Sequence, residues 1–347
     1  MNALVLKEPF SLMGEDRPLP QPRPGEMIVQ VAFCGVCRTD RKAYRQGQRD
    51  LKLPRVLGHE FSGRIVAAGL GLPRDTLGRK VSVHPGIFCG ACAACRSGND
   101  QLCESMRILG FHLDGGFAKY VRIPKQGVER GVVRILEDGF DLRYAAMAEP
   151  LGCAVHMANL LPLEDISSVL ITGGGVMGMM TAKILRQLPR KILLTEPLAN
   201  KRKLLQGMGL PAVSPENLRE GMAKLGLAAF DCAINCSPHS LCLAQCLQTV
   251  RKGGYFGFFS GLTDFTGMEK DVVNEIHYKE LTVKGAYGCG SRDTLQALAL
   301  IQNGLELSDI PVRRIALSDC ETVLRCEETE DSILTMIDME VDDYAGM

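Results

Sequence analysis

The sequence predicts an α/β plus β protein, in which a β-rich first part is followed by a doubly wound parallel sheet covered by helices. Its 347 residues are enough for about two domains. Hydrophobic residues make up 46% and charged residues 23%, which is the composition of an ordinary globular protein. Near residue 149, short β-prone runs broken by Gly and Pro give way to apolar strands that alternate with helical segments.

The first third contains four short runs rich in β-branched and aromatic residues, at 27–33, 61–66, 80–83 and 117–121. Runs of this length, separated by frequent turn residues, are typical of a barrel or a sandwich. The proline-rich stretch 17–24 predicts an irregular connection, because proline fixes φ and lacks an N–H donor.

The second part alternates strands with helices, which predicts parallel strands joined by helical crossovers. Pro189, Gly209 and Gly304 follow three of the helical segments and mark their ends. The expected strands are 168–172, 191–195, 230–235, 254–259 and 281–284, and the expected helices are 176–188, 200–208 and 292–303.

Charge, hydropathy and the first residues of the chain restrict the class of protein and its expected location. Lys plus Arg and Asp plus Glu each number 40, so the zero net charge argues against nucleic acid. No window reaches the 18 or so apolar residues that span a bilayer, so we expect no membrane segment. The first residues lack the pattern of a secretory signal, so we expect a cytoplasmic protein. In a reducing compartment, clustered cysteines among the fourteen present more often bind metal than form disulfides.

The strongest motif is Cys89, Cys92 and Cys95, followed by Cys103. Two-residue spacers let successive thiolates turn onto one ion, which predicts a tetrahedral Cys₄ zinc site. Four protein ligands leave no open position for water, so this zinc would be structural. Four unrelated free cysteines and an iron–sulfur cluster are the alternatives.

A second motif lies between the expected strand 168–172 and the helix that follows it. Gly173, Gly175 and Gly178 fill G-x-G-x-x-G in the strand-to-helix context that dinucleotide binding requires. Val176 and Met177 complete the first helical turn, whose N–H groups would face the cofactor phosphates. The alternative is a glycine turn of an α/β domain that binds nothing.

Glu196 ends the next strand about 20 residues later, where an acceptor for the ribose hydroxyls belongs. Its carboxylate would repel a 2′-phosphate, which favours NAD over NADP. Lys201 and Arg202 follow closely and act in the opposite direction, and we include Lys201 among the cofactor-binding candidates.

A third, dispersed set consists of Cys37, His59, Glu60 and Glu149. A thiolate, an imidazole and a carboxylate together form an open, catalytic zinc site in many enzymes. Spacing does not distinguish this set from a buried cysteine and a core histidine with satisfied hydrogen bonds.

Taken together, these motifs resemble the zinc-dependent medium-chain alcohol and polyol dehydrogenases, with Glu149-Pro150-Leu151 as in the sorbitol and threonine dehydrogenase branch. The resemblance runs from about Met27 to about Leu317 and includes Gly58-His59-Glu60 and the segment 114–120. It implies a GroES-like β-barrel catalytic domain at 1–148 with a structural-zinc lobe at about 86–105, an inserted Rossmann domain at 149–288, and a return to the catalytic domain at 289–347.

The resemblance also implies roles. Cys37 and His59 match the constant ligands of the catalytic zinc, and Glu60 matches the adjacent carboxylate that binds the metal or exchanges with water. Glu149 occupies the position where the classical alcohol dehydrogenases have a third ligand cysteine. Thr39 matches the hydroxyl that begins proton transfer. Asp40 matches the carboxylate that orients the ligand histidine. Lys42 stands where the family often has a relay histidine, and is either a proton shuttle or a solvated surface residue.

The activity implied is hydride transfer between NAD and a secondary alcohol, polyol or sugar, including a sugar phosphate, with an alcohol or ketone as small-molecule substrate. One catalytic and one structural zinc are expected, in a homodimer or homotetramer. A threonine-type amino-alcohol dehydrogenase and a non-catalytic dinucleotide-binding sensor or scaffold are the alternatives. His156 also matches a family position, and we interpret it as structural.

Overall fold

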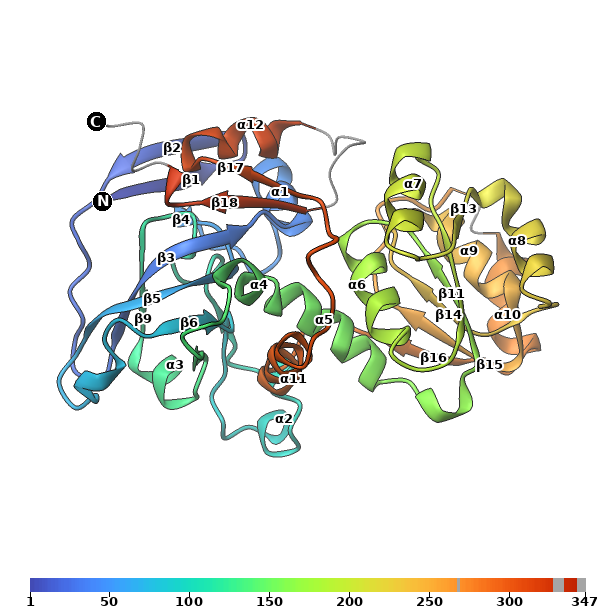
Figure 1. Cartoon of the computed structure of the whole chain (residues 1–347), viewed down its shortest axis with the longest axis horizontal. Helices are drawn as coiled ribbons and strands as arrows, with labels where there is room; N and C mark the ends of the chain where they lie inside the picture. Colours follow the sequence, from blue (N-terminus) through green and yellow to red (C-terminus); the bar gives the residue numbers. More distant parts are fainter. Residues whose placement is uncertain (267–268, 327–333, 342–347) are drawn as a thin grey trace. The chain divides into compact units, whose positions relative to one another are not determined.

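The computed structural model describes residues 1–266, 269–326 and 334–341 (Figure 1). The chain forms two compact units. The first unit combines residues 1–149 with the described part of the chain from Gly290 onward, and the second unit contains Pro150–Cys289.

The second unit is built on a six-stranded parallel sheet in the order β13-β12-β11-β14-β15-β16. Its strands step outward from β11 in one direction and then in the other, so the strand order reverses beside β11. Every residue of β11 is buried, as expected for a strand covered on both faces. The strands are β11 (Ser168–Thr172), β12 (Lys191–Thr195), β13 (Ala212–Val213), β14 (Phe230–Asn235), β15 (Val250–Phe258) and β16 (Thr282–Gly285).

Helices cover both faces of this sheet, α6 and α7 on one side and α8, α9 and α10 on the other (Figure 1). Leu170, Phe230, Leu247 and Phe256 are buried in one core cluster of this unit. The helices are α6 (Val176–Leu185), α7 (Ala199–Gly207), α8 (Leu218–Lys224), α9 (Ser240–Thr249) and α10 (Lys270–Tyr278), while α5 (Ala148–Asn159) begins at the last residues of the first unit.

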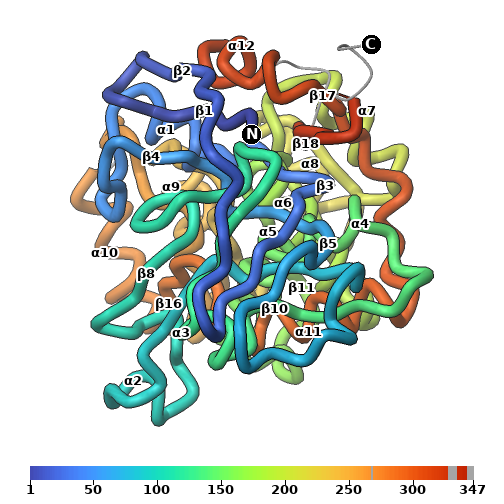
Figure 2. The backbone as a smooth tube through the Cα atoms, turned by 90° about the vertical axis from the view of Figure 1, so that its left-hand side faces the viewer, coloured from blue at the N-terminus to red at the C-terminus, as the bar shows by residue number. Residues whose placement is uncertain are grey.

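The first unit is mainly antiparallel β-structure. Its largest sheet has the order β10-β6-β5-β3-β18-β17, with β9 also paired to β3. The C-terminal strand β18 pairs with β3 from the first third of the chain, as Figure 2 shows, with Ile337 opposite Cys34. The strands are β1 (Asn2–Glu8), β2 (Ser11–Asp16), β3 (Met27–Gly35), β4 (Arg55–Val56), β5 (Glu60–Ala68), β6 (Lys80–Val83), β7 (Gly86–Ile87), β8 (Arg107–Ile108), β9 (Tyr120–Ile123), β10 (Val133–Ile135), β17 (Val312–Ile315) and β18 (Leu334–Asp338).

Short helices connect these strands. The first of them buries Asp40, Ala43 and Tyr44 completely, whereas Arg38 and Lys42 are exposed. The expected helix 292–303 is present within one residue at each end. The helices are α1 (Arg38–Gln46), α2 (Ala93–Arg96), α3 (Lys125–Glu129), α4 (Leu142–Ala146), α11 (Ser291–Gln302) and α12 (Cys320–Arg325).

Three expected elements differ from the observed ones by more than two residues at one end. The strand expected at 254–259 begins earlier, at Val250. The run 117–121 becomes a strand only from Tyr120, because Phe117 and Ala118 pair instead with the loop at Leu57 and with β1. The expected helix 176–188 ends at Leu185, and the residues before Pro189 form turns. Of the helices that the structure describes, none is both long and apolar enough to cross a bilayer.

Candidate metal and cofactor sites

Cys37 is the N-cap residue of α1. Its sulfur accepts the Thr39 N–H, and the Asp40 carboxylate accepts the Cys37 N–H at 2.9 Å, so the two side chains form a capping box. This reciprocal pairing starts the helix just after β3 ends and fixes the direction of the thiol.

His59 and Glu60 reach the same place from the next strand. Because β3 and β5 are antiparallel with Gly35 opposite Glu60, the start of β5 lies beside the start of α1. The ligand atoms of Cys37, His59 and Glu60 lie within 4.8 Å of one another, and His59 and Glu60 are buried. A Cβ on Gly35 would lie 2.0 Å from a Glu60 carboxylate oxygen, so only glycine leaves room for this carboxylate.

Asp40 lies against Cys37 and His59 of this group. It is fully buried, and its Oδ1 lies 3.3 Å from His59 Nδ1 and accepts the Gly58 N–H. Burial lowers the pKa of His59, but the charge and hydrogen bonding of Asp40 outweigh it and raise that pKa well above its usual value. Burial and then the Glu60 charge raise the pKa of Cys37 to about 11. A metal that binds here must therefore displace protons.

The other residues expected at this site lie as follows. The Thr39 hydroxyl is 3.6 Å from the Cys37 sulfur and half-buried, whereas the Lys42 side chain is exposed. The Glu149 carboxylate is not part of this three-residue group. Its oxygen lies instead within 4.8 Å of the thiols of Cys153, one turn later in α5, and Cys289. His156 is buried farther along α5.

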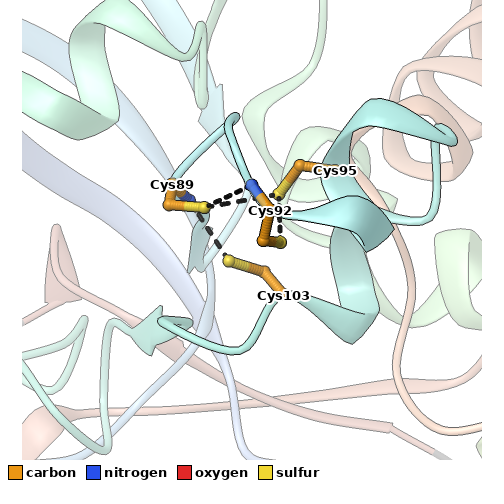
Figure 3. A group of neighbouring side chains, drawn as sticks. All are labelled: Cys89, Cys92, Cys95 and Cys103. Atoms are coloured by element: carbon orange, nitrogen blue, oxygen red, sulfur yellow. Dashed lines mark hydrogen bonds between the residues drawn. The ribbon is translucent and has the colours of Figure 1, made fainter.

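The four cysteines of the expected structural site do converge (Figure 3). The Cys92 and Cys95 sulfurs are 3.4 Å apart, and those of Cys89 and Cys95 are 3.9 Å apart. Zinc–sulfur bonds of about 2.3 Å in a tetrahedron place sulfurs about 3.8 Å apart, so these distances suit zinc.

The backbone around this cluster favours thiolates. The N–H groups of Ala91 and Cys92 each donate to the Cys89 sulfur at 3.3 Å and lower the pKa of Cys89 to about 6. Burial and the neighbouring Cys92 sulfur raise the pKa of Cys95 to about 12. Without a metal, the cluster thus favours a thiolate at Cys89 and a neutral thiol at Cys95. A bound cation would stabilise all four thiolates together.

The glycine turn has the geometry expected for binding a pyrophosphate. Gly173 has φ of +96°, which favours glycine, and a Cβ on Gly178 would lie 1.9 Å from the Gly173 carbonyl oxygen. A Cβ on Gly175 would meet no atom within 4 Å. The first turn of α6, which contains Val176 and Met177, has no side-chain cap, so its N–H groups are available to an anion.

Glu196 lies at the end of β12, next to this turn. Its Oε2 accepts the Gly174 N–H and its Oε1 accepts the Leu198 N–H, both at 2.9 Å, and the side chain is buried. Lys201 is buried on α7, and Arg202 donates to the carbonyl oxygens of Glu196 and Pro197. The carboxylate is therefore held in one position beside the glycine turn.

The sequence alone did not single out four of these residues. Gly35 and Gly174 each lie against the side chain of a buried glutamate, and the only signal was a glycine in the same segment as a candidate residue. Cys153 and Cys289 approach Glu149 from distant parts of the chain, and no spacing could have joined them.

Comparisons with known proteins agree with this arrangement. Residues 23–132 match the alcohol dehydrogenase GroES-like domain family, and residues 175–303 match the zinc-binding dehydrogenase family. An L-threonine 3-dehydrogenase of Rhizobium etli (strain CIAT 652) is 32% identical over 329 residues, which cover 92% of this chain and 93% of the relative. An L-galactonate-5-dehydrogenase of Escherichia coli (strain K12) is 29% identical over 322 residues, with 89% and 90% covered.

Among solved structures, a zinc-binding dehydrogenase of Sinorhizobium meliloti 1021 bound to NADP superposes with a TM-score of 0.87. The two chains are 28% identical, and the match covers 97% of this chain and 98% of the other. The two matched domains and the extent of the likeness to the Rhizobium etli enzyme show that this chain belongs to the zinc-dependent medium-chain alcohol and polyol dehydrogenase family.

Proposed function

We propose that this protein oxidises a secondary alcohol, polyol or sugar with NAD, and that Cys37, His59 and Glu60 hold the zinc that the reaction needs. The observation that carries the proposal is the convergence of these three side chains, from the end of β3 and the start of β5, at a buried position. They stand in a chain that also presents a glycine turn suited to a dinucleotide.

The donor set fits catalytic zinc. A thiolate, an imidazole and a carboxylate are common zinc ligands, and three protein ligands leave a position open for substrate. Bound there, zinc would supply Lewis-acid polarisation of the substrate oxygen. The resemblance to the sorbitol and threonine dehydrogenase branch predicts Glu149 as a further carboxylate ligand, but its oxygen groups with Cys153 and Cys289, so we leave it out of this set.

The protein's own residues would orient the groups and move the proton. Asp40 Oδ1 lies 3.3 Å from His59 Nδ1, which would leave Nε2 of the ring to bind the metal. The Thr39 hydroxyl, 3.6 Å from the Cys37 sulfur, would take the proton of the substrate hydroxyl as the hydride leaves for the nicotinamide. Because Lys42 is exposed, we place it where the proton passes from the site to solvent, away from the substrate.

The cofactor would lie along the first turn of α6. Gly173, Gly175 and Gly178 would admit the pyrophosphate, and Glu196 would accept hydrogen bonds from the adenosine ribose. A negative charge fixed at this point disfavours a 2′-phosphate, so we propose NAD. Because a solved relative is bound to NADP, the affinities of this protein for NAD and NADP should both be measured.

The substrate class follows from the site and from the relatives. L-threonine and L-galactonate, named in two relatives, both carry a hydroxyl group on a carbon chain that also bears a carboxylate. We place polyols and sugars, including sugar acids and sugar phosphates, first, and threonine second.

We further propose that the protein works as a homodimer or homotetramer in the cytoplasm, where its fourteen free cysteines stay reduced. Light scattering coupled to gel filtration measures the oligomeric state, and fractionation of the host cell measures the location.

The test is NAD reduction at 340 nm by zinc-loaded protein with polyols, sugar acids, sugar phosphates, secondary alcohols and threonine. The Cys37→Ser variant should lose turnover and one zinc per chain while it keeps its fold. Cys326→Ser is the matched control, because Cys326 is exposed and belongs to none of the described metal-ligand groups. Full turnover by Cys37→Ser would refute the catalytic zinc. Tight NADH binding without turnover of any substrate would favour the sensor alternative.

A further inference from the structure

The lobe that carries the four cysteines holds the start of α11 through Asp100. This aspartate begins a short 3₁₀ turn, Asp100–Leu102, and only 6% of it is exposed. One carboxylate oxygen accepts the Ser291 N–H at 2.9 Å, and the other accepts the Ser291 hydroxyl at 2.5 Å. A buried carboxylate with two such bonds is fixed in place, and it also faces the positive end of a twelve-residue helix.

The contact is tight on either side of Ser291. A Cβ on Gly290 would lie 2.8 Å from the Asp100 carboxylate, and a Cβ on Gly98 would lie 2.9 Å from an Arg292 guanidinium nitrogen. Three successive residues at the start of α11 therefore fit against the lobe.

The contact matters because α11 begins where the chain returns to the first unit. Gly290 is the first residue of the first unit after the chain returns from the nucleotide-binding unit. The Thr294 hydroxyl is 2.9 Å from His84 Nδ1. Leu298 of the same helix packs in a core cluster with Ala148, which lies just before the point where the chain leaves the first unit. The residues at both chain crossings are thus attached to one helix.

The metal ligands are coupled to Asp100 through the backbone. The Cys103 N–H donates to the Asp100 carbonyl oxygen at 3.0 Å, so the fourth cysteine and the aspartate share one turn. A metal that fixes Cys103 also fixes this turn. Without the metal, the two hydrogen bonds to Ser291 would have to order the lobe by themselves.

We propose that Asp100 is a positioning residue that links occupancy of the Cys₄ metal site to the placement of the chain crossings, and through them to cofactor affinity. The proposal rests on the proposed function only in taking the second unit to bind NADH. It gives the lobe a role beyond stability, because metal loss there should weaken nucleotide binding at a site to which the lobe contributes no ligand.

The experiment compares wild type, Asp100→Ala and Glu104→Gln as zinc-loaded full-length proteins. Glu104 is the matched control, since it is an exposed acid of the same lobe, next to Cys103. Hydrogen exchange of the amides 291–294 should be about tenfold faster in Asp100→Ala and unchanged in Glu104→Gln. The Kd for NADH should rise at least about fivefold in Asp100→Ala alone. With a substrate available, the KM for NAD should rise while kcat at saturating NAD is retained.

A second comparison separates coupling from general damage. Cys92→Ser, which removes a ligand of the metal, should raise the exchange rate and the Kd for NADH in the same way, and Asp100→Ala should add little in the double variant. If Cys92→Ser does not fold, Ser291→Ala replaces it, because it removes the hydroxyl hydrogen bond between the helix and Asp100. Faster exchange with an unchanged Kd, or fully additive effects, would overturn the proposal. Failure of the wild type to bind NADH or NADPH would refute the proposed function instead.

Discussion

Substitution by alanine should have different effects at two glycines of the nucleotide turn. It should lower stability at Gly178 and NADH affinity at Gly175. In Gly178→Ala, the new Cβ would lie 1.9 Å from the Gly173 carbonyl oxygen, well over an ångström closer than ordinary contact. The atom that it meets is backbone, so α6 must move away from β11. Overpacking of this kind costs about 1–3 kcal/mol. For a unit of this size, that lowers Tm by roughly 3–10 °C.

In Gly175→Ala, the new Cβ would meet no atom within 4 Å, and φ of −75° with ψ of −168° is extended backbone that alanine adopts. We expect the Tm to stay within about 1–2 °C of wild type, because substitutions without strain change stability little. The open space is where we place the pyrophosphate, so a methyl group there blocks a charged hydrogen bond worth about 1.5–3 kcal/mol. The Kd for NADH should therefore rise by about 10- to 100-fold.

Thermal melting and NADH titration measure both variants. The chain contains no Trp, so the fluorescence of bound NADH can be read without energy transfer from tryptophan. Unchanged NADH affinity in Gly175→Ala would show that the pyrophosphate does not cross this turn. A wild-type Tm in Gly178→Ala would refute the close contact between helix and strand.

Four further outcomes are expected. Cys92→Ser should lose one zinc per chain by elemental analysis and lower Tm by more than about 5 °C, because closed zinc sites contribute folding energy. Thr39→Val should lower kcat by about 10²- to 10⁴-fold without changing the Kd for NADH, as stopped-flow and titration would measure. Glu196→Ser should raise the ratio of NADPH to NADH affinity by more than about tenfold, since it removes the charge that repels a 2′-phosphate. Asp231→Asn should lower the free energy of unfolding at pH 7 by about 1–3 kcal/mol in urea titrations. Hydrogen bonds from Arg251, Ser168 and nearby backbone N–H groups outweigh burial and lower the pKa of Asp231, so this deficit should be present above about pH 4 and shrink below it.

The sequence predicted the second unit better than the first. Strands 168–172, 191–195 and 230–235 were placed to the residue, because a strand buried on both faces is a continuous apolar run that ends at polar or glycine residues. In the first unit, β1 and β2 pair with each other and partly with loops. Buried and exposed residues therefore alternate less regularly along them, and neither strand was predicted.

The metal ligands show where prediction from sequence stops. Cys89 to Cys103 lie within fifteen residues, so their spacing alone brings four sulfurs together. Cys37 and His59 meet only because β3 and β5 pair in one register, which spacing does not reveal. For that pair, the family resemblance supplied what local reasoning lacked. It could not supply the contact between Asp100 and Ser291, which are 191 residues apart.

Three of the carboxylates to which we assign roles, those of Glu60, Glu196 and Asp100, share one structural solution. Glu60, Glu196 and Asp100 are all buried, and each lies directly against a glycine, at Gly35, Gly174 and Gly290 respectively; a Cβ on any of these glycines would come within 3.1 Å of that side chain. A buried carboxylate costs several kcal/mol unless hydrogen-bond donors approach it closely. Glycine permits that approach, and backbone N–H groups donate to both Glu196 and Asp100. Gly175 has no such neighbour, and the open space beside it is where we place the pyrophosphate.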